Sequence, residues 1–425
     1  MHTPESQPQA QPRRRGRFAG AREALSVFAD PNYRWYWIGS FGYYTGLHME
    51  MTARAQLAYD LSGSAMMLGV AAISQGLPST LMSILGGTLA DRWPKRKMLL
   101  VAQMMLAVSG VLMFALLATG LIEFWHLVVI GVLRGLTTGF SLPARLSMVS
   151  EVVPENQFLK AYSLYYVALN TMRIGGPSIA GILIGLTGGT TLAFLIIGIA
   201  HIVGLFALLP VRSLRLAQGK RRESILQDIG GMFSFAWSSA TIMVLLGAEM
   251  GISLFASSVN NSLLPIFSQE VFHQPRGVGL ATLQAAAGGG GLVGSMLITA
   301  VSSTNRKPLM LLTVGMVYGS VLILFANSPI FFMATATIGL VGVCQASYTT
   351  LNSTLFQLNS PPEMRGRATT LYLLGNAASP IGTLPIGYFS DMIGVQTVVT
   401  ITGSLLIAYM LSVAVLFPAF RRKEI

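Results

Sequence analysis

The sequence predicts an all-α polytopic membrane protein with twelve transmembrane helices in two pseudo-symmetric six-helix halves. Hydrophobic residues make up 52% of the 425 residues and charged residues only 10%, whereas a soluble domain carries about 25% charged residues. Apolar runs of about 20 residues, the length that a helix needs to cross a bilayer, recur between short polar turns. An internal repeat supports the halves, because Pro154 and Pro177 recur in matching positions as Pro362 and Pro385.

Each helix is expected where an apolar run is bounded by a polar, basic or glycine-containing turn. The turn Asp60 to Ser64 separates the first two runs, and the charged stretch Asp91 to Lys97 separates the next two. Aromatic residues before and within the first run predict an interfacial belt of Tyr33, Trp35, Tyr36 and Trp37. The expected helices cover 35–59, 66–90, 98–120, 126–149, 161–186, a run that ends near Pro210, 235–263, 277–301, 308–327, 330–354, 368–390 and 395–418.

The charged segments divide the chain and set its orientation. The net charge is +12, and most of the 28 lysine and arginine residues fall in segments on one side of the expected helices. This pattern indicates cytoplasmic loops and two cytoplasmic termini in a bacterial inner membrane, not a nucleic-acid-binding surface. The expected divisions are a disordered basic N-terminus (1–33), a first half (34–211), a cytoplasmic linker (212–232), a second half (233–419) and a tail (420–425).

The stretch from Gly86 to Lys97 contains the pattern G-x-x-x-D-R-x-x-K-R-K. It resembles the signature loop between helices 2 and 3 of the major facilitator superfamily of secondary transporters, although Pro94 stands where that family usually has glycine. The resemblance implies a conformational latch. Its residues would be Gly87, Asp91, Arg92 and Arg96. The alternative is an ordinary positive-inside loop in which the aspartate caps a helix.

A second motif, Arg173-Ile174-Gly175-Gly176-Pro177-Ser178-Ile179-Ala180-Gly181, lies in the helix expected over 161–186. Together with Leu142–Arg145 and Val153–Glu155, it resembles the drug:proton antiporter branch that includes macrolide efflux proteins and the enterobactin exporter. Val167 departs from that branch, because it stands in place of the leading glycine of the antiporter motif. The motif residues that the resemblance indicates are Arg173, Gly176, Pro177 and Gly181.

Ionisable residues within the apolar runs are functional candidates, because a charge in hydrocarbon costs at least about 2.5 to 3.5 kcal/mol. Glu50 and Glu249 are the two acids well within expected helices, and we expect Glu50 to be the leading proton-coupling site and Glu249 the second. Arg54 follows Glu50 at i+4, so the two can pair on one helix face. A static ion pair that only fixes helix packing is the alternative.

Polar and aromatic stripes suggest a substrate chamber, because in this superfamily helices 1, 4, 7 and 10 line the central cavity. The alternative for each residue is hydrogen bonding between helices, or, for Arg134, a structural contact with a carbonyl or carboxylate. The candidate cavity residues are Tyr43, Tyr44, Arg54, Arg134, Ser253, Gln345, Tyr348 and Asn352.

The resemblance implies a secondary active transporter that exports amphipathic small molecules, drug-like compounds or siderophores, by proton antiport and alternating access. We expect protons, a small-molecule substrate and the lipid bilayer as partners, no cofactor or metal, and no enzymatic activity. No P-loop pattern is present, which argues against ATP as the energy source. A proton-coupled importer, a non-transporting receptor and a lipid scramblase remain alternatives. Oligomeric state is left open, a monomer being one option.

Overall fold

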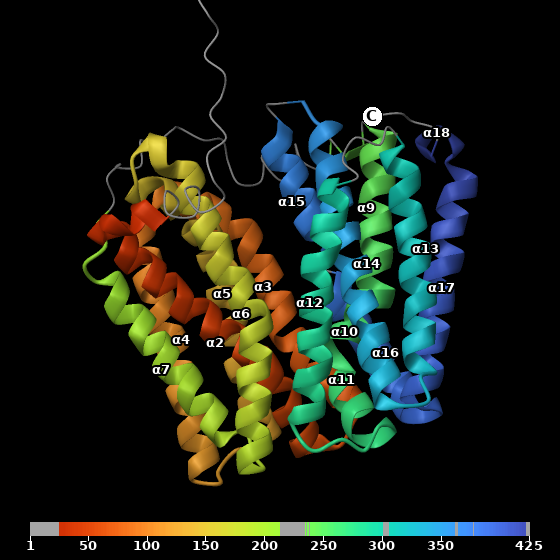
Figure 1. Cartoon of the computed structure of the whole chain (residues 1–425), viewed down its shortest axis with the longest axis horizontal. Helices are drawn as coiled ribbons and strands as arrows, with labels where there is room; N and C mark the ends of the chain where they lie inside the picture. Colours follow the sequence, from red (N-terminus) through yellow and green to blue (C-terminus); the bar gives the residue numbers. More distant parts are fainter. Residues whose placement is uncertain are drawn as a thin grey trace, which may run out of the picture.

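The structure is a computed structural model that describes residues 25–212, 234, 236–237, 239–300, 306–361, 364–376 and 378–421. Every regular element in these residues is a helix, and the helices form two bundles that lie side by side (Figure 1). The all-α polytopic fold predicted from the sequence is therefore confirmed.

The N-terminal half contains six long helices. The first begins where the Asp30 side chain accepts a hydrogen bond of 2.8 Å from the backbone N–H of Asn32, and Pro31 occupies the first helical position, where no N–H is needed. It ends at Gly63, whose φ of 61° favours glycine. The elements are η1 (Ser26–Ala29), α2 (Pro31–Ser62), α3 (Ala65–Arg92), α4 (Lys95–Ala118), α5 (Phe124–Val152), η2 (Glu155–Gln157), α6 (Phe158–Thr187) and α7 (Thr191–Leu208).

The C-terminal half starts with a helix that changes its winding. After α9, a π-helical turn lets the Ser258 hydroxyl donate to the carbonyl of Ser253 over 2.9 Å, which shifts the faces of the residues that follow. The elements are α9 (Ala240–Ile252), π-helical η3 (Ser253–Ser257), α10 (Ser258–Ser262), α11 (Leu264–Ile266), π-helical η4 (Phe267–Val271), α12 (Val278–Ala300), α13 (Lys307–Ala326), α14 (Phe331–Leu358), α15 (Arg365–Asn376), α16 (Ala378–Ile393), α17 (Val395–Leu416) and α18 (Pro418–Arg421).

Ten helical segments within the described residues are long and apolar enough to cross a membrane. The other two of the twelve predicted transmembrane helices correspond to α2 and to the pair α15 and α16, which are not among these ten segments. Polar residues such as His48, Glu50 and Arg54 lower the hydropathy of α2, and α15 and α16 are 12 and 16 residues long. The count of twelve is thus supported for ten segments and stays a prediction for these two.

The two halves repeat the same packing. In the N-terminal half α3 packs on α5, α4 on α7 and α2 on α6; in the C-terminal half α12 packs on α14, α13 on α17, and η3 on α16. These are the same pairs when the helices of each half are numbered in order from its start. The pseudo-symmetry predicted from the repeated prolines is therefore present in the packing.

Two helix pairs make most of the contact between the halves, α3 with α16 and α6 with α12, and α3 with α10 and α15 and α2 with α11 add smaller contacts. We call the end of the bundles where α2 begins and α18 ends the terminal end, and the opposite end the distal end. Among the described residues, several hydrogen bonds and ion pairs that join the halves lie nearer the distal end. They are Thr52 with Gln284, Tyr59 with Glu270, Asp60 with Arg276, Thr383 with Gly69, and Ser64, Ala65 and Met66 with Asp391.

Parts of the expected organisation lie outside the described residues. This applies to most of the expected N-terminal segment (1–33), to the linker apart from Arg212, and to the end of the tail. Helical structure begins earlier than the expected boundary at residue 33, because η1 and the start of α2 precede it. The expected divisions stay proposals.

Candidate functional site

A carboxylate without contact to solvent lies near the middle of α2. Glu50 is 1% exposed, and its Oε1 atom lies 3.1 Å from Nε of Arg134 on α5 and 4.0 Å from Nη1 of Arg54 on its own helix. The side chain of Gln75 on α3 donates to Oε2 over 3.2 Å. Burial of a charge requires such compensation, and here two cations and one amide provide it.

The two arginines also hold neighbouring helices. Arg134 donates to the hydroxyl of Ser109 on α4 over 2.7 Å, and Arg54 donates over 2.9 Å to both the carbonyl of Ala71 and the hydroxyl of Ser74 on α3. Donors that are satisfied in this way fix the guanidinium groups in place. Glu50 thus takes part in two ion pairs. The predicted pair with Arg54 is the longer one, and the shorter one, with Arg134, joins α2 to α5.

The network continues through His201, Gln103 and Arg145, which were not predicted as site residues, to the predicted cavity residue Tyr43. An Nη2 atom of Arg134 lies 3.4 Å from Nε2 of His201 on α7, and the side chain of Gln103 on α4 donates to the His201 carbonyl over 3.0 Å. Arg145 donates to Gln103 over 3.2 Å and lies 4.0 Å above the ring centroid of Tyr43. A polar residue in the middle of an apolar run was the available signal for Gln103 and His201.

The second predicted proton-coupling residue lies in the equivalent first helix of the C-terminal half. Glu249 on α9 is 2% exposed and accepts a hydrogen bond of 2.5 Å from the side chain of Asn352 on α14. The helix α15 passes so close that a Cβ atom at Gly375 would lie 2.6 Å from Cγ of Glu249. Among the described residues it has no ion-pair partner, which distinguishes it from Glu50.

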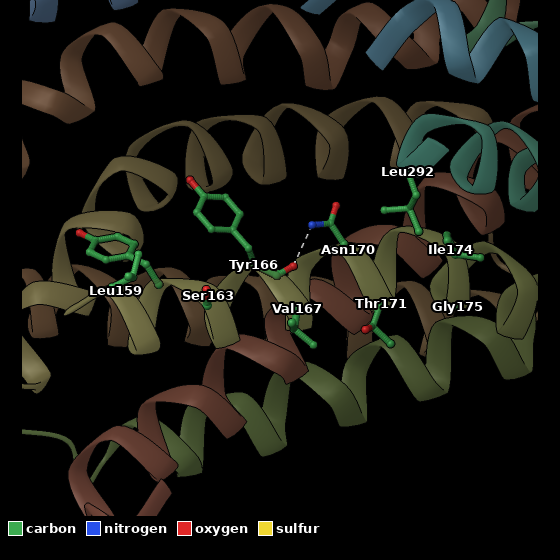
Figure 2. A pocket seen from close by; sticks show the side chains of 10 residues that line it. Leu159, Ser163, Tyr166, Val167, Asn170, Thr171, Ile174, Gly175 and Leu292 are labelled. Atoms are coloured by element: carbon green, nitrogen blue, oxygen red, sulfur yellow. Dashed lines mark hydrogen bonds between the residues drawn. The ribbon is translucent and has the colours of Figure 1, made fainter. Parts of the chain in front are cut away.

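An open groove of about 810 Å³ runs along one face of α6 (Figure 2). Its lining comes from positions three or four residues apart on α6, and Leu292 of α12 closes one end. Two tyrosines and several aliphatic side chains alternate with Ser163, Asn170 and Thr171, so the surface is amphipathic. The full lining is Leu159, Tyr162, Ser163, Tyr166, Val167, Asn170, Thr171, Ile174, Gly175 and Leu292.

The predicted cavity residues lie elsewhere in this conformation. Gln345 on α14 is half-buried, and the others are buried inside the halves, where Tyr44, for example, shares a hydrogen bond of 2.5 Å with Tyr165. None of the predicted set lines the α6 groove. The buried members are Tyr43, Tyr44, Arg54, Arg134, Ser253, Tyr348 and Asn352. Their assignment to a substrate cavity stays a prediction.

The predicted helix motif mediates close packing on two sides of α6. A Cβ atom at Gly176 would meet His48 of α2 at 2.7 Å, and one at Gly181 would meet the carbonyl of Gly277, just before α12, at 2.6 Å. Pro177 lies buried between these two positions. Arg173 lies on the face of α6 turned toward α12, where its guanidinium is 3.7 Å from the Cβ position of Gly291.

The predicted latch is described only in part. Arg96 at the start of α4 donates to the carbonyl of Leu209 beyond α7, so this arginine holds two helices of the same half together. The backbone of Gly87, Asp91 and Arg92 belongs to the last turns of α3, but their side chains lie outside the described residues. The latch therefore stays a prediction.

Membrane-spanning helices in two pseudo-symmetric halves, with buried ionisable groups and a groove at the boundary, define the class of secondary transporters. The model of one family, described as transmembrane secretion effector, matches residues 22–424. The chain belongs to this family of the major facilitator superfamily. The predicted superfamily and the predicted class of membrane transporter, rather than enzyme, are confirmed.

Named relatives agree with this membership. The chain is 24% identical over 360 residues to macrolide efflux protein A of Streptococcus pyogenes, covering 82% of this chain and 86% of that protein. It is 26% identical over 367 residues to the multidrug efflux pump Tap of Mycobacterium bovis, covering 82% and 84%. It is 23% identical over 351 residues to the staphyloferrin A transporter of Staphylococcus aureus, covering 80% and 85%.

A solved structure shows the same fold. A crystal structure of a peptide transporter of the POT type aligns with a TM-score of 0.71 over 93% of this chain and 95% of that one, at 14% sequence identity. At this identity the likeness concerns the fold alone.

Proposed function

We propose that this protein is a proton-driven exporter of amphipathic small molecules that works by alternating access. The observation that carries the proposal is the asymmetry of the boundary between the halves. Hydrogen bonds and ion pairs close the boundary near the distal end, whereas the α6 groove extends from Leu159, near the terminal end, to Gly175. Such an arrangement is expected of a carrier that is open to one side of the membrane.

Orientation follows from the basic residues at the terminal end. Lys95, Arg96 and Lys97 precede the body of α4, and Arg306, Lys307 and Arg421 lie at the same end of the other half. By the positive-inside rule we infer that this end faces the cytoplasm, which would put both termini on that side and make the conformation inward-facing. We propose a bacterial inner membrane as the location, since the relatives with efflux names are bacterial proteins.

The α6 groove is the proposed entry site for substrate. Its tyrosines and aliphatic side chains can contact apolar surface, while Ser163, Asn170 and Thr171 can orient polar groups. This lining suits amphipathic molecules. The relatives named for macrolide efflux and for staphyloferrin A transport supply two substrate types to test.

Glu50 is the proposed leading proton-coupling residue, because α2 links its charge network to the other half. Two residues beyond Glu50, the hydroxyl of Thr52 donates to the side chain of Gln284 on α12. If the halves separate at this point, the part of α2 that carries Glu50 would move, and the ion pair of Glu50 with Arg134 would change its geometry. A shift of that geometry changes how well the two cations stabilise the carboxylate, and thereby couples its protonation to access.

We expect Glu50→Gln to abolish uphill export and to leave substrate binding in place. The measurement is gradient-driven accumulation of a radiolabelled macrolide and of radiolabelled staphyloferrin A in inside-out proteoliposomes, with an imposed pH gradient. Glu123→Gln, at an exposed acid in the distal turn of the same half, is the matched control. Accumulation that survives in Glu50→Gln but fails in Glu249→Gln would reverse the two roles, and survival in both variants would refute proton coupling through either residue.

A further inference from the structure

Asp391, at the distal end of α16, makes a contact that reaches across the boundary between the halves. Its carboxylate accepts hydrogen bonds from the hydroxyl of Ser64 over 2.6 Å, from the backbone N–H of Ala65 over 2.7 Å and from that of Met66 over 3.0 Å. Ala65 is the first residue of α3. An acid from one half therefore satisfies the free N–H groups at the start of a helix in the other half.

The chemistry makes this contact specific. The first N–H groups of a helix have no partner within the helix, and the helix dipole concentrates positive charge there. Ser64 takes part as well, because its hydroxyl oxygen accepts from the N–H of Met67 over 3.3 Å. The Asp391 carboxylate completes this cap from outside the helix. Two of the three donors are backbone N–H groups. A change of side-chain rotamer in α3 therefore cannot move these two donors to another acceptor.

The contact lies at the distal end of the crossing of α3 with α16. A Cβ atom at Gly387 would meet the carbon of the Ala65 carbonyl at 2.8 Å, and one at Gly69 would meet the Thr383 carbonyl at 2.7 Å. The helices can approach this closely only because glycine stands at these points. When the halves separate at the distal end, the cap donors are drawn away from Asp391 and must be solvated.

We propose that Asp391 is a positioning residue of the transport cycle, which holds α3 against α16 and thereby stabilises the distally closed, inward-facing conformation. This inference rests on the proposed alternating access. It also gives the predicted latch a counterpart. We expect Asp91, in the last turns of α3, to meet the N-terminal end of the helix expected over 368–390, which begins as α15 in the structure. Asp391 on α16 would then cap α3, and Asp91 on α3 would cap α15, the helix before α16, at opposite ends of the molecule and in opposite conformations.

The test uses two cysteine reporters in a Cys344→Ser background, since Cys344 is the only native cysteine. Thr383→Cys reports on the distal crossing, where Thr383 is 2% exposed, and Asn170→Cys reports on the α6 groove. The probe is a membrane-impermeant maleimide applied to either side of oriented vesicles. We expect Asp391→Asn to raise the labelling rate at the first reporter and to lower it at the second, each by about fivefold, the effect of losing a helix cap.

Controls separate a positioning role from a loss of folding. Asp391→Glu keeps the charge and should recover labelling toward the native rates. Asp60→Asn removes the ion pair with the exposed Arg276 side chain and keeps an oxygen that can accept from Gln56, so it should change labelling less than twofold, roughly the weight of a surface pair. Unchanged labelling in both Asp391→Asn and Asp391→Ala would overturn the proposal. The readout needs neither substrate nor a proton gradient, so failure of proton-driven export would leave a labelling shift intact, and the two ideas fail separately.

Discussion

Arg134 is the residue whose removal should harm the fold most directly. Its guanidinium contacts Glu50, Ser109 and His201, and the side chain is 2% exposed. We expect Arg134→Ala to lower the free energy of unfolding by about 3 kcal/mol, since Glu50 would be left buried with the more distant Arg54 as its one cation and Gln75 as its hydrogen-bond donor. Thermal unfolding of the purified protein in detergent measures this loss.

A surface cation provides the comparison. Arg276 lies 3.8 Å from Asp60, and its side chain is 58% exposed, so Arg276→Ala should cost no more than about 1 kcal/mol. Equal melting temperatures for the two variants would contradict the structural role of Arg134. Restoration by Arg134→Lys would show that charge alone, rather than the geometry of the guanidinium group, is required.

Spacing along one helix predicted part of this network and missed the rest. The i, i+4 relation places Arg54 beside Glu50, and the structure has them 4.0 Å apart. The shorter contact, with Arg134, depends on how α2 and α5 are rotated about their axes. The residue spacing within one helix does not determine how a neighbouring helix is rotated. For the same reason the sequence indicated that Arg134 is special but not which carboxylate it meets.

At the scale of elements, the crossing of α6 with α12 depends on small side chains. A Cβ atom at Gly181 would meet Ala281 and the carbonyl of Gly277. We expect Gly181→Val to destabilise the distally closed state by about 1 to 3 kcal/mol through overpacking, and hence to raise maleimide labelling at the Thr383→Cys reporter. Gly189→Ala is the control, because a Cβ atom there has nothing within 4 Å. Identical labelling in the two variants would rule out the close crossing.

Helix positions could be predicted from hydropathy, but helix faces only in part. The prediction of an interfacial aromatic belt is wrong for Tyr33 and Tyr36, because both side chains are fully buried. Their hydroxyls donate to the carbonyls of Ala161 and Arg145 over 2.7 and 2.5 Å, respectively. Tyrosine suits both an interface and a buried position with a hydrogen-bond partner, so composition cannot choose between them. In the C-terminal half, the π-helical turn after Ile252 shifts the register that regular helical spacing assumes.

For the whole molecule, neutralising Asp91 should act in the direction opposite to neutralising Asp391. If the Asp91 carboxylate caps a helix of the other half only when the terminal end is closed, Asp91→Asn disfavours that conformation. We expect insertion to be intact, most transport to be lost and labelling at the groove reporter Asn170→Cys to rise by about fivefold. Labelling in the double variant with Asp391→Asn should return toward the native ratio. Normal flux with unchanged labelling in Asp91→Asn would refute the latch.

The arrangement of the halves shows where prediction from the sequence ends. Repeated prolines and a basic middle segment predicted two six-helix units, and their matching helix pairs are present. Which end is closed depends on small differences in free energy between two packings of the same surfaces. The α6 groove lies at this boundary and depends on how α6 and α12 are placed, so the polar stripes of single helices could not predict it.

In the described part of the network around Glu50, Arg54 and Arg134 lie beside this one acid, and Arg145 adds a third cation that contacts Gln103 and Tyr43. A half that bears uncompensated charge cannot tilt within a bilayer without electrical work. Moving one elementary charge through the whole membrane field is worth about 2.3 kcal/mol per 100 mV, and a partial displacement is worth a proportional share. If the network keeps this excess of positive charge, we expect a membrane potential that is negative inside to bias its position, so that the resting potential would act on the carrier as an effector without a binding site.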